Sequence, residues 1–409
     1  MISKVFIYHP SKYLGGTEVL FSRVAILLKD QLGCQVTIVG YNESCAVKRA
    51  LGVRWRDFNY IDCARSDWYS ELNGCALISS AKNIVRFNSI NFAPNVRFRS
   101  IFWLVHPAEL YSQIGVGYDR VKKILGYKFL RFFYRLNPFS FPFESLLKEL
   151  DSCGSLYFMD RSVLRESEWV MIRRFVNPRF LYLTSGLISR ECKVPRGENC
   201  VLLSRLDSFK ISGINRLLTD LESSQKSGGW SGNLTIIGDG DGLELLRERA
   251  RKLSFTVEFA GYIPSDKIRD YLLEGGFAVF FGMGMSLLEG ASIGIPCIML
   301  PASDTDINDE RCYISLNVED GGLGEYFYSP SRSAGYVALP ELLQDIFCNA
   351  DAYKEKSLLF FEKFYSYDAS VNGLKNALVG QDGRPESRAL ISLLNGIVSK
   401  CREALGQDE

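Results

Sequence analysis

The stretch VLLSRLDSFKISGINRLLTDLESSQKSGGWSGNLTII, residues 201–237, contains the alternation that decides the fold. Two short apolar runs, 201–204 and 234–237, enclose apolar residues at helical spacing, which are Ile214, Leu217, Leu218 and Leu221. The pattern continues to residue 300, with further strand-like runs at 257–261, 277–281 and 297–300. Short strands that alternate with helices form parallel sheets. The sequence therefore predicts a doubly wound α/β domain, whose ligands bind at the carboxyl ends of the strands.

The first half of the chain has a similar but less regular pattern. Strand-like runs occur at 5–8, 35–40, 76–79, 100–105, 155–159 and 180–184. A long amphipathic helix is expected from Thr17 to about Leu32. Residues 188–199 lack periodicity and contain Arg, Lys, Pro and Gly, which indicates a linker. We therefore predict one Rossmann-like domain over 1–190, a second over 197–365, and C-terminal helices over 366–409.

The composition excludes several classes of protein. The 409 residues are 47% hydrophobic and 23% charged, as in an ordinary soluble globular protein. Lys and Arg number 48 and Asp and Glu number 47, so the net charge of +1 gives no general attraction to nucleic acid. Eleven scattered cysteines without a C-x-x-C pair, and only two histidines, predict reduced thiols and no metal site. No run reaches the roughly 18 apolar residues of a membrane-spanning helix, so we expect a cytoplasmic protein.

A glycine pair, Gly15 and Gly16, lies between the first predicted strand and the long helix. Two glycines allow a tight turn and the close approach of a ligand. The N-terminus of the helix would then face an anion such as a diphosphate. A plain strand-to-helix turn explains the pair equally well.

Two cations, Arg205 and Lys210, flank the loop after the first strand of the second domain. Such a loop faces the ligand crevice, where both side chains could neutralise a leaving diphosphate. Two solvated surface charges are the alternative. Gly238 begins the turn GDGDG at 238–242, which we interpret first as turn chemistry and second as a ligand contact.

A second glycine turn, Gly282-Met283-Gly284, precedes a helix that carries Ser286 and Glu289. Its backbone could approach a sugar or a phosphate, and the Glu289 carboxylate could accept hydrogen bonds from a ribose diol. Ser286 and Glu289 also have the spacing of a capping box, which needs no ligand. Both interpretations stay open at this point.

His106 follows a strand-like run of the first domain, so we expect it where the crevice opens. A histidine there could bind a ligand through a hydrogen bond or act as an acid or base. A purely structural histidine is the alternative.

Residues 119–143 combine cations with aromatic residues. Lys128, Arg131 and Arg135 share one helical face, and Phe132 and Phe133 belong to an apolar stripe at spacings of three and four. This pattern is typical of a helix that lies among the headgroups of an anionic membrane. The alternative is a surface helix whose Phe stripe packs on its own domain.

Taken in order, these motifs resemble the retaining GT-B glycosyltransferases of family 4, the glycosyl transferases of group 1. The resemblance rests on Gly15-Gly16-Thr17-Glu18, Arg205 with Lys210, Gly238-Asp239-Gly240, and the segments 259–262 and 284–296. It implies a GT-B fold, in which two Rossmann-like doubly wound domains face each other across a cleft. The N-terminal domain would bind the acceptor and the C-terminal domain the nucleotide sugar. The C-terminal helices would return to the N-terminal domain.

The resemblance also implies roles for single residues. Arg205 and Lys210 match the basic pair that holds the donor diphosphate, so that no metal is needed, and His106 matches a catalytic histidine near the donor sugar. Gly15 and Gly16 match the turn that faces the phosphates. The other implied donor contacts are Glu289 at the ribose, Ile263 at the base, Gly238, and Gly282, Met283 and Gly284 under the donor sugar.

One position departs from the family's pattern. The family has another glutamate, separated by seven intervening residues from the one that Glu289 matches, and this earlier glutamate contacts the donor sugar. The chain has Phe281 at that position. The departure bears on the identity of the sugar and on turnover, whereas the diphosphate and ribose contacts remain.

We therefore expect a retaining, metal-independent, hexosyl-type glycosyltransferase without a cofactor. Its donor would be a nucleotide sugar, a UDP-sugar in first place and a GDP-sugar in second. Its acceptor would be a saccharide, lipid-linked if residues 119–143 touch the inner face of the cell membrane, as in polysaccharide or lipopolysaccharide assembly. The alternatives are a catalytically degenerate nucleotide-sugar-binding protein and a GT-B sugar-nucleotide epimerase.

Overall fold

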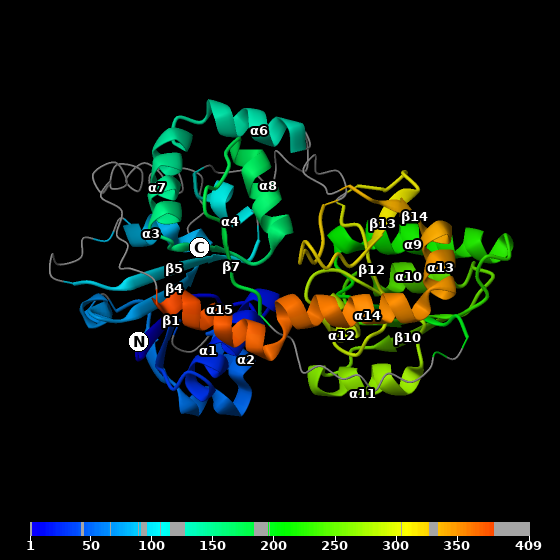
Figure 1. Ribbon diagram of the computed structural model, residues 1–409, viewed down its shortest axis with the longest axis horizontal. Coiled ribbons are helices and arrows are strands. Elements are labelled where there is room, and N and C mark those ends of the chain that lie inside the picture. Colours follow the sequence, from blue (N-terminus) through cyan, green and yellow to red (C-terminus); the bar gives the residue numbers. More distant parts are fainter. Residues whose placement is uncertain are drawn as a thin grey trace. The chain divides into compact units, whose positions relative to one another are not determined.

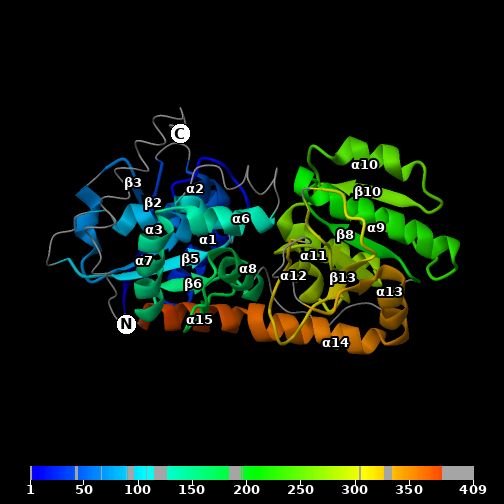
Figure 2. The same ribbon diagram turned by 90° about the horizontal axis from the view of Figure 1, so that it is seen from above.

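The computed structural model describes residues 2–41, 45–65, 67–88, 90, 96–106, 108–114, 127–183, 195, 197–303, 305–326 and 334–379. The chain forms two compact units. The first unit contains residues 1–183 together with the chain from residue 370, and the second unit contains residues 184–369. In each unit, helices cover both faces of a sheet (Figures 1 and 2). None of the described helices is long and apolar enough to span a membrane.

The first unit is built on a seven-stranded parallel sheet with the strand order β3-β2-β1-β4-β5-β6-β7. The strands are β1 (Lys4–Tyr8), β2 (Gln35–Gly40), β3 (Asn59–Asp62), β4 (Ala76–Ser80), β5 (Arg99–Leu104), β6 (Leu156–Phe158) and β7 (Arg179–Phe180). Six of these correspond to predicted strands, and β3 was not expected. Its residues are exposed or half-buried at the edge of the sheet, so no apolar run marks it in the sequence.

Within the described residues, eleven helices and helical turns between residues 16 and 171 accompany this sheet. The longer ones are α1 (Gly16–Asp30), α6 (Tyr127–Leu136), α7 (Ser140–Ser152) and α8 (Arg161–Met171). The shorter ones are α2 (Ala46–Leu51), α3 (Ile84–Asn88), α4 (Ala108–Tyr111) and the 3₁₀ turns η1 (Gly52–Asp57) and η2 (Asp67–Leu72), followed by η3 (Ala81–Asn83) and η4 (Ser112–Ile114). In α1, Leu20, Val24 and Leu27 recur at helical spacing and are buried, which fixes the face that packs on the sheet.

Helix α15 (Tyr367–Val379), from the far end of the chain, is fastened to the first unit by a buried arginine. The Arg99 guanidinium, at the start of β5, donates to the carbonyl of Ala377 at 3.1 Å and to those of Cys153 at 3.2 Å and Gly154 at 2.6 Å. These carbonyl groups lie at the C-terminal ends of α15 and α7, where helix dipoles are negative. The buried positive charge is therefore neutralised by two helix ends.

The second unit also has a seven-stranded sheet, with the order β10-β9-β8-β11-β12-β13-β14. The strands are β8 (Cys200–Leu203), β9 (Leu234–Ile237), β10 (Val257–Gly261), β11 (Val279–Gly282), β12 (Cys297–Met299), β13 (Arg311–Ser315) and β14 (Val337–Ala338). The first five are parallel, as the alternation of strands and helices predicts. β13 and β14 extend the sheet in antiparallel orientation and were not expected.

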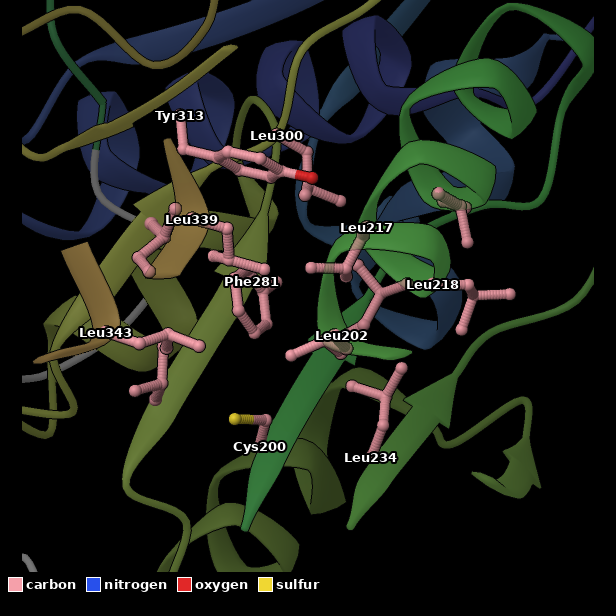
Figure 3. Close-up of a cluster of buried hydrophobic side chains, with 14 of the residues drawn as sticks. Cys200, Leu202, Leu217, Leu218, Leu234, Phe281, Leu300, Tyr313, Leu339 and Leu343 are labelled. Carbon is pink, nitrogen blue, oxygen red and sulfur yellow. The ribbon is translucent and has the colours of Figure 1, made fainter. Parts of the chain in front are cut away.

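The helices of the second unit bury leucine-rich faces on this sheet. They are α9 (Ser208–Lys226), α10 (Leu243–Ala250), α11 (Ser265–Gly275), α12 (Ser286–Ala291), α13 (Leu339–Cys348), α14 (Ala350–Phe360) and the π-helical turn η5 (Phe361–Tyr365). Figure 3 shows the core on one face, where Leu217 and Leu218 of α9 lie over Leu202 of β8. The apolar residues that the sequence shows at helical spacing thus form the buried face of α9.

Candidate functional site

The carboxyl edge of the second sheet contains a topological switch point. From β8 the sheet continues to β9 and β10 on one side, and to β11 and β12 on the other. Ligands of open α/β sheets bind outside the carboxyl ends of the strands at such a reversal. The loop after β8 carries Arg205, and the turn at the end of β11 is Gly282 to Gly284. The fold therefore brings these two predicted segments to neighbouring strand ends.

The two predicted phosphate ligands lie at the N-terminus of α9. The Arg205 side chain is 65% exposed, and its Nη2 lies 3.0 Å from Oδ2 of Asp207. Lys210 lies in the first turn of α9 and is half-buried. Burial and then the neighbouring Arg205 charge lower the pKa of Lys210 to about 8. A bound anion would relieve the repulsion between the two cations and would meet the positive end of the helix dipole.

Gly238, which directly follows β9, packs closely against the backbone next to Arg205. It has a φ of +138°, and a Cβ placed on it would lie 1.9 Å from the carbonyl oxygen of Ser204. Its own N–H donates to the carbonyl of Gly261 at 2.8 Å. A side chain at 238 would push the β9 loop away from the β8 loop. The structure therefore explains this glycine by close backbone packing beside the candidate site.

In the glycine turn at the end of β11, the backbone N–H groups of Met283 and Gly284 form hydrogen bonds within the protein. The N–H of Met283 donates to Oγ of Ser286 at 3.2 Å, and the N–H of Gly284 donates to the carbonyl of Leu323 at 2.7 Å. Gly284 has a φ of +66°, and a Cβ on Gly282 would lie 2.9 Å from Oγ of Ser286. These glycines thus allow a tight turn and a close neighbour, and the two amides are not available to a ligand in this arrangement.

Glu289 lies in α12 and is half-buried, on the helix that begins directly after this turn. The predicted capping box takes a different form, because Ser286 is the first residue of α12 and Met285 is its N-cap. The Ser286 hydroxyl bonds both the N–H and the carbonyl of Met283. Ile263 is half-buried and follows β10, two strands away from β8.

In the first unit, the glycine turn at Gly15 and Gly16 contacts a buried pair of side chains, His9 and Glu18, that the sequence did not reveal. The contact is a hydrogen bond to Gly15. Nε2 of His9 lies 2.8 Å from Oε1 of Glu18, whose Oε2 accepts the N–H of Gly15 at 2.8 Å. Burial lowers the pKa of His9 and would raise that of Glu18, but the hydrogen bonds from His9 and Ser11 lower the pKa of Glu18 to about 2. A neutral His9 therefore donates to an ionised Glu18, which caps the start of α1.

His106 lies just after β5 and is exposed, and its Nδ1 accepts the N–H of Ala108 at 3.1 Å. In the neutral ring, Nε2 then carries the proton and is a hydrogen-bond donor. The turn that carries His106 is closed by the carboxylate of Glu109. This carboxylate accepts hydrogen bonds from the hydroxyl of Ser80 at 2.8 Å and from the N–H of Val105 at 3.1 Å. Burial raises the pKa of Glu109 to about 7. The sequence analysis did not single out Glu109, since only its contacts distinguish it.

Comparison with known proteins identifies the fold of the chain and a family match for part of it. Residues 197–321 match the family model of the glycosyl transferases group 1, whereas no curated protein matches the chain. The solved apo form of the lipopolysaccharide outer core galactosyltransferase WaaB aligns with a TM-score of 0.55 and 15% identity, over 91% of this chain and 98% of that one. The chain has the GT-B fold. The segment that matches the group 1 model lies in its second unit, as the resemblance predicted.

Two further structures are similar to this GT-B chain. A glycosyltransferase from Rickettsia africae ESF-5 aligns with a TM-score of 0.48 and 13% identity, over 99% of both chains. WaaG, described as a glycosyltransferase involved in lipopolysaccharide biosynthesis, aligns with a TM-score of 0.47 and 14% identity, over 92% of this chain and 100% of that one.

Phe281, the departure from the family's pattern, lies in the core of the GT-B second unit. It belongs to β11, pairs with Leu202 and Ile298 in the neighbouring strands, and is 0% exposed. Figure 3 shows its ring among the side chains of the hydrophobic cluster, with Leu339 close by. Position 281 is therefore a core position in this chain, and its side chain does not face a ligand.

Helix α6 carries the predicted membrane residues of the GT-B first unit. Among the described side chains of α6, Leu130 and Tyr134 are buried, whereas Phe132 is 56% and Leu136 64% exposed. Phe129, Phe133 and Arg135 are also exposed, and the guanidinium of Arg131 lies 5.4 Å from the centre of the Trp169 ring in α8. The alternative interpretation, that the Phe stripe packs on its own domain, does not hold for these exposed Phe side chains. The side chain of Lys128 lies outside the described residues.

Proposed function

We propose that the chain is a glycosyltransferase that moves a sugar from a nucleotide diphosphate donor to a saccharide acceptor. The observation that carries the proposal is the pair of crowded cations, Arg205 and Lys210, at the switch point of the group 1 segment. Arg and Lys stabilise phosphate oxygens through charge-assisted hydrogen bonds. A group that acquires negative charge as it leaves gains most from such preorganised donors.

In the proposed reaction, the bond between the anomeric carbon and the diphosphate oxygen breaks, and the electron pair goes to that oxygen. The acceptor hydroxyl attacks from the same face, which retains the configuration, and its proton goes to the departing diphosphate. Arg205 and Lys210 take the role that a divalent cation has elsewhere, so the proposal needs no metal. His106, with its proton on Nε2, would donate a hydrogen bond rather than act as a base.

The test is alanine substitution of Arg205 and of Lys210. Each change should lower kcat/KM for transfer about 30-fold, which corresponds to about 2 kcal/mol of transition-state stabilisation. Arg247 is a matched control, because it is also an exposed arginine paired with an acid, at 2.7 Å from Glu244. Arg247→Ala should transfer sugar at the wild-type rate. Wild-type transfer by both site variants would contradict the proposal.

A nucleotide-sugar-binding protein without turnover is the second candidate, and Phe281 favours it, because the buried ring leaves no carboxylate at that position. Calorimetry separates the two functions. Binding of a nucleotide sugar without transfer to any saccharide supports the second candidate. Conversion of the donor in the absence of an acceptor would instead indicate an epimerase.

We further propose that the acceptor is lipid-linked and that α6 contacts an anionic membrane at its cytoplasmic face. Exposed Phe132, Phe133 and Leu136 beside Arg135 support this, because aromatic side chains insert among headgroups and cations meet anionic lipid. The variant Phe132→Ser/Phe133→Ser should sediment less with vesicles that contain phosphatidylglycerol. Leu245→Ser, which removes a side chain that is 55% exposed on α10, is the control. Equal sedimentation of all three proteins would contradict membrane contact.

A further inference from the structure

A glycine-rich loop that the sequence analysis did not single out lies at the carboxyl edge of the second sheet. Its residues 320–326 read DGGLGEY. The carbonyl of Leu323 accepts the N–H of Gly284, at the end of β11, at 2.7 Å. Tyr326 forms a parallel bridge with Ala302, just after β12. Glu325 therefore lies on a short backbone segment that is fastened to the ends of two adjacent strands, where ligands of this fold class bind.

The loop and the Met283 turn are in close contact. Gly324 has a φ of +152°, and a Cβ placed on it would lie 3.1 Å from Cγ of Met283 and 3.6 Å from the N of Gly284. Glu325 follows Gly324 directly, so its Cα lies about 3.8 Å farther along the chain. The carboxylate-bearing residue is thus a neighbour of the turn that the family resemblance places under the donor sugar.

The other end of the loop is held rigidly. The hydroxyl of Tyr365, in the turn η5, is buried and donates to the carbonyl of Gly321 at 2.7 Å. Gly321 has a φ of +70°, and a Cβ on it would lie 3.0 Å from the Phe364 ring. Asp320 accepts the N–H of Gly322 at 3.2 Å, which closes the turn locally. A loop held at both ends can present one side chain in a fixed position, which a specific binding site requires.

Glu325 itself is oriented by a hydrogen bond. It is half-buried, and the hydroxyl of Tyr336 donates to its Oε2 at 3.0 Å. The amides of Met283 and Gly284 are engaged within the protein, so side chains must contact the sugar hydroxyls at this turn. A hydroxyl group that donates its proton needs an acceptor. A carboxylate is the strongest such acceptor, because each of its oxygens can receive hydroxyl protons.

We propose that Glu325 accepts hydrogen bonds from hydroxyl groups of the transferred sugar, with Tyr336 as its positioning residue. This inference rests on the proposed function. A negative side chain beside the sugar also repels a sugar that carries its own carboxylate. Glu325 therefore selects neutral hexoses over uronic acids, which names the class of donor more narrowly.

The test compares a nucleotide with its sugar derivatives in calorimetric titrations. The ligands are UDP, UDP-glucose, UDP-galactose and UDP-glucuronate, with GDP and GDP-mannose as a parallel series. Glu325→Gln should bind UDP or GDP as the wild type does, and should bind the preferred neutral sugar nucleotide about tenfold more weakly. The same variant should bind UDP-glucuronate no more weakly than the wild type does. Tyr336→Phe should weaken the neutral sugar nucleotide by a smaller factor.

Glu319→Gln is the matched control, since Glu319 lies just before the loop, is 81% exposed and pairs with Lys363 at 3.5 Å. It should bind every ligand as the wild type does. Unchanged binding of UDP by Glu325→Gln shows that the variant is folded. If the wild type and Glu325→Gln then bind the neutral sugar nucleotide equally well, the inference is wrong. If the wild type binds neither nucleotide, the proposed function fails and the inference fails with it.

Discussion

The lowered pKa of Lys210 makes binding of a diphosphate depend on pH in a way that tests the candidate site. The pKa is about 8 in the free protein, against an ordinary value of 10.5, because of burial and then the charge of Arg205. A diphosphate bound between the two cations stabilises the protonated form and raises this pKa again. The protonated protein therefore binds the ligand, and affinity falls as the pH rises above 8.

The size of the effect follows from linkage. Above pH 8, the dissociation constant should rise about tenfold per pH unit, or about 1.4 kcal/mol, until the pKa of the complex is reached. Between pH 7 and pH 9 the loss of affinity should thus be about tenfold. Binding at pH 8 should take up about half a proton, because half of the free Lys210 side chains are ionised there. A nucleotide sugar is the best ligand, since its diphosphate charge is constant in this range.

The assay is calorimetric titration at pH 7, 8 and 9 in two buffers of different ionisation enthalpy, which reports affinity and proton uptake together. Lys210→Met should bind weakly and without this pH dependence. Arg205→Ala removes the like charge and should move the fall in affinity to higher pH. A dissociation constant of the wild type that stays constant from pH 7 to 9, without proton uptake at pH 8, would refute the reasoning.

Three further predictions concern stability. Phe281→Glu should lower the free energy of unfolding by at least about 3 kcal/mol, since it buries a carboxyl in the core, and a urea midpoint equal to that of Phe281→Leu would contradict this. Ile172→Gly should stabilise the protein by about 1 kcal/mol, because Ile172 has a φ of +53°, and a lower urea midpoint would refute it. Arg99→Met leaves buried carbonyls unbonded and should cost about 3 kcal/mol. Unchanged hydrogen exchange in α15 would speak against that role of Arg99.

The elements that could be predicted from the sequence are those whose signal is local. The run at 234–237 has the bounds of β9, because a buried inner strand needs an uninterrupted apolar run. The run at 257–261 has the bounds of β10, although β10 lies at the edge of the sheet and is only half-buried or exposed. The strands that were not predicted lack this signal. β3 is only half-buried, and β13 and β14 pair in the antiparallel orientation that the alternation of strands and helices does not predict.

The face by which a helix packs was harder to predict from the sequence than the helix itself, as α6 shows. Its exposed Phe129, Phe132 and Phe133 and its buried Leu130 and Tyr134 all obey helical spacing. Period alone therefore allows two stripes, and only the packing against the rest of the first unit selects one. The His9–Glu18 pair was missed for a related reason, since a lone histidine gains its meaning from the partner that the fold supplies.

Phe281 shows why the candidate site could be located from the sequence but not completed. The motif spacing identified position 281 as the departure from the family's pattern, yet the spacing does not show which way a side chain points. β11 extends through residue 282, and strand alternation then turns residue 281 toward the core. A carboxylate at position 281 would therefore also point into the core, as long as β11 continues through residue 282. Any acidic contact to that sugar must therefore come from another segment. Glu325 is the contact that we propose, and the hydrogen bond between Leu323 and Gly284, together with the bridge between Tyr326 and Ala302, brings it to this edge of the sheet.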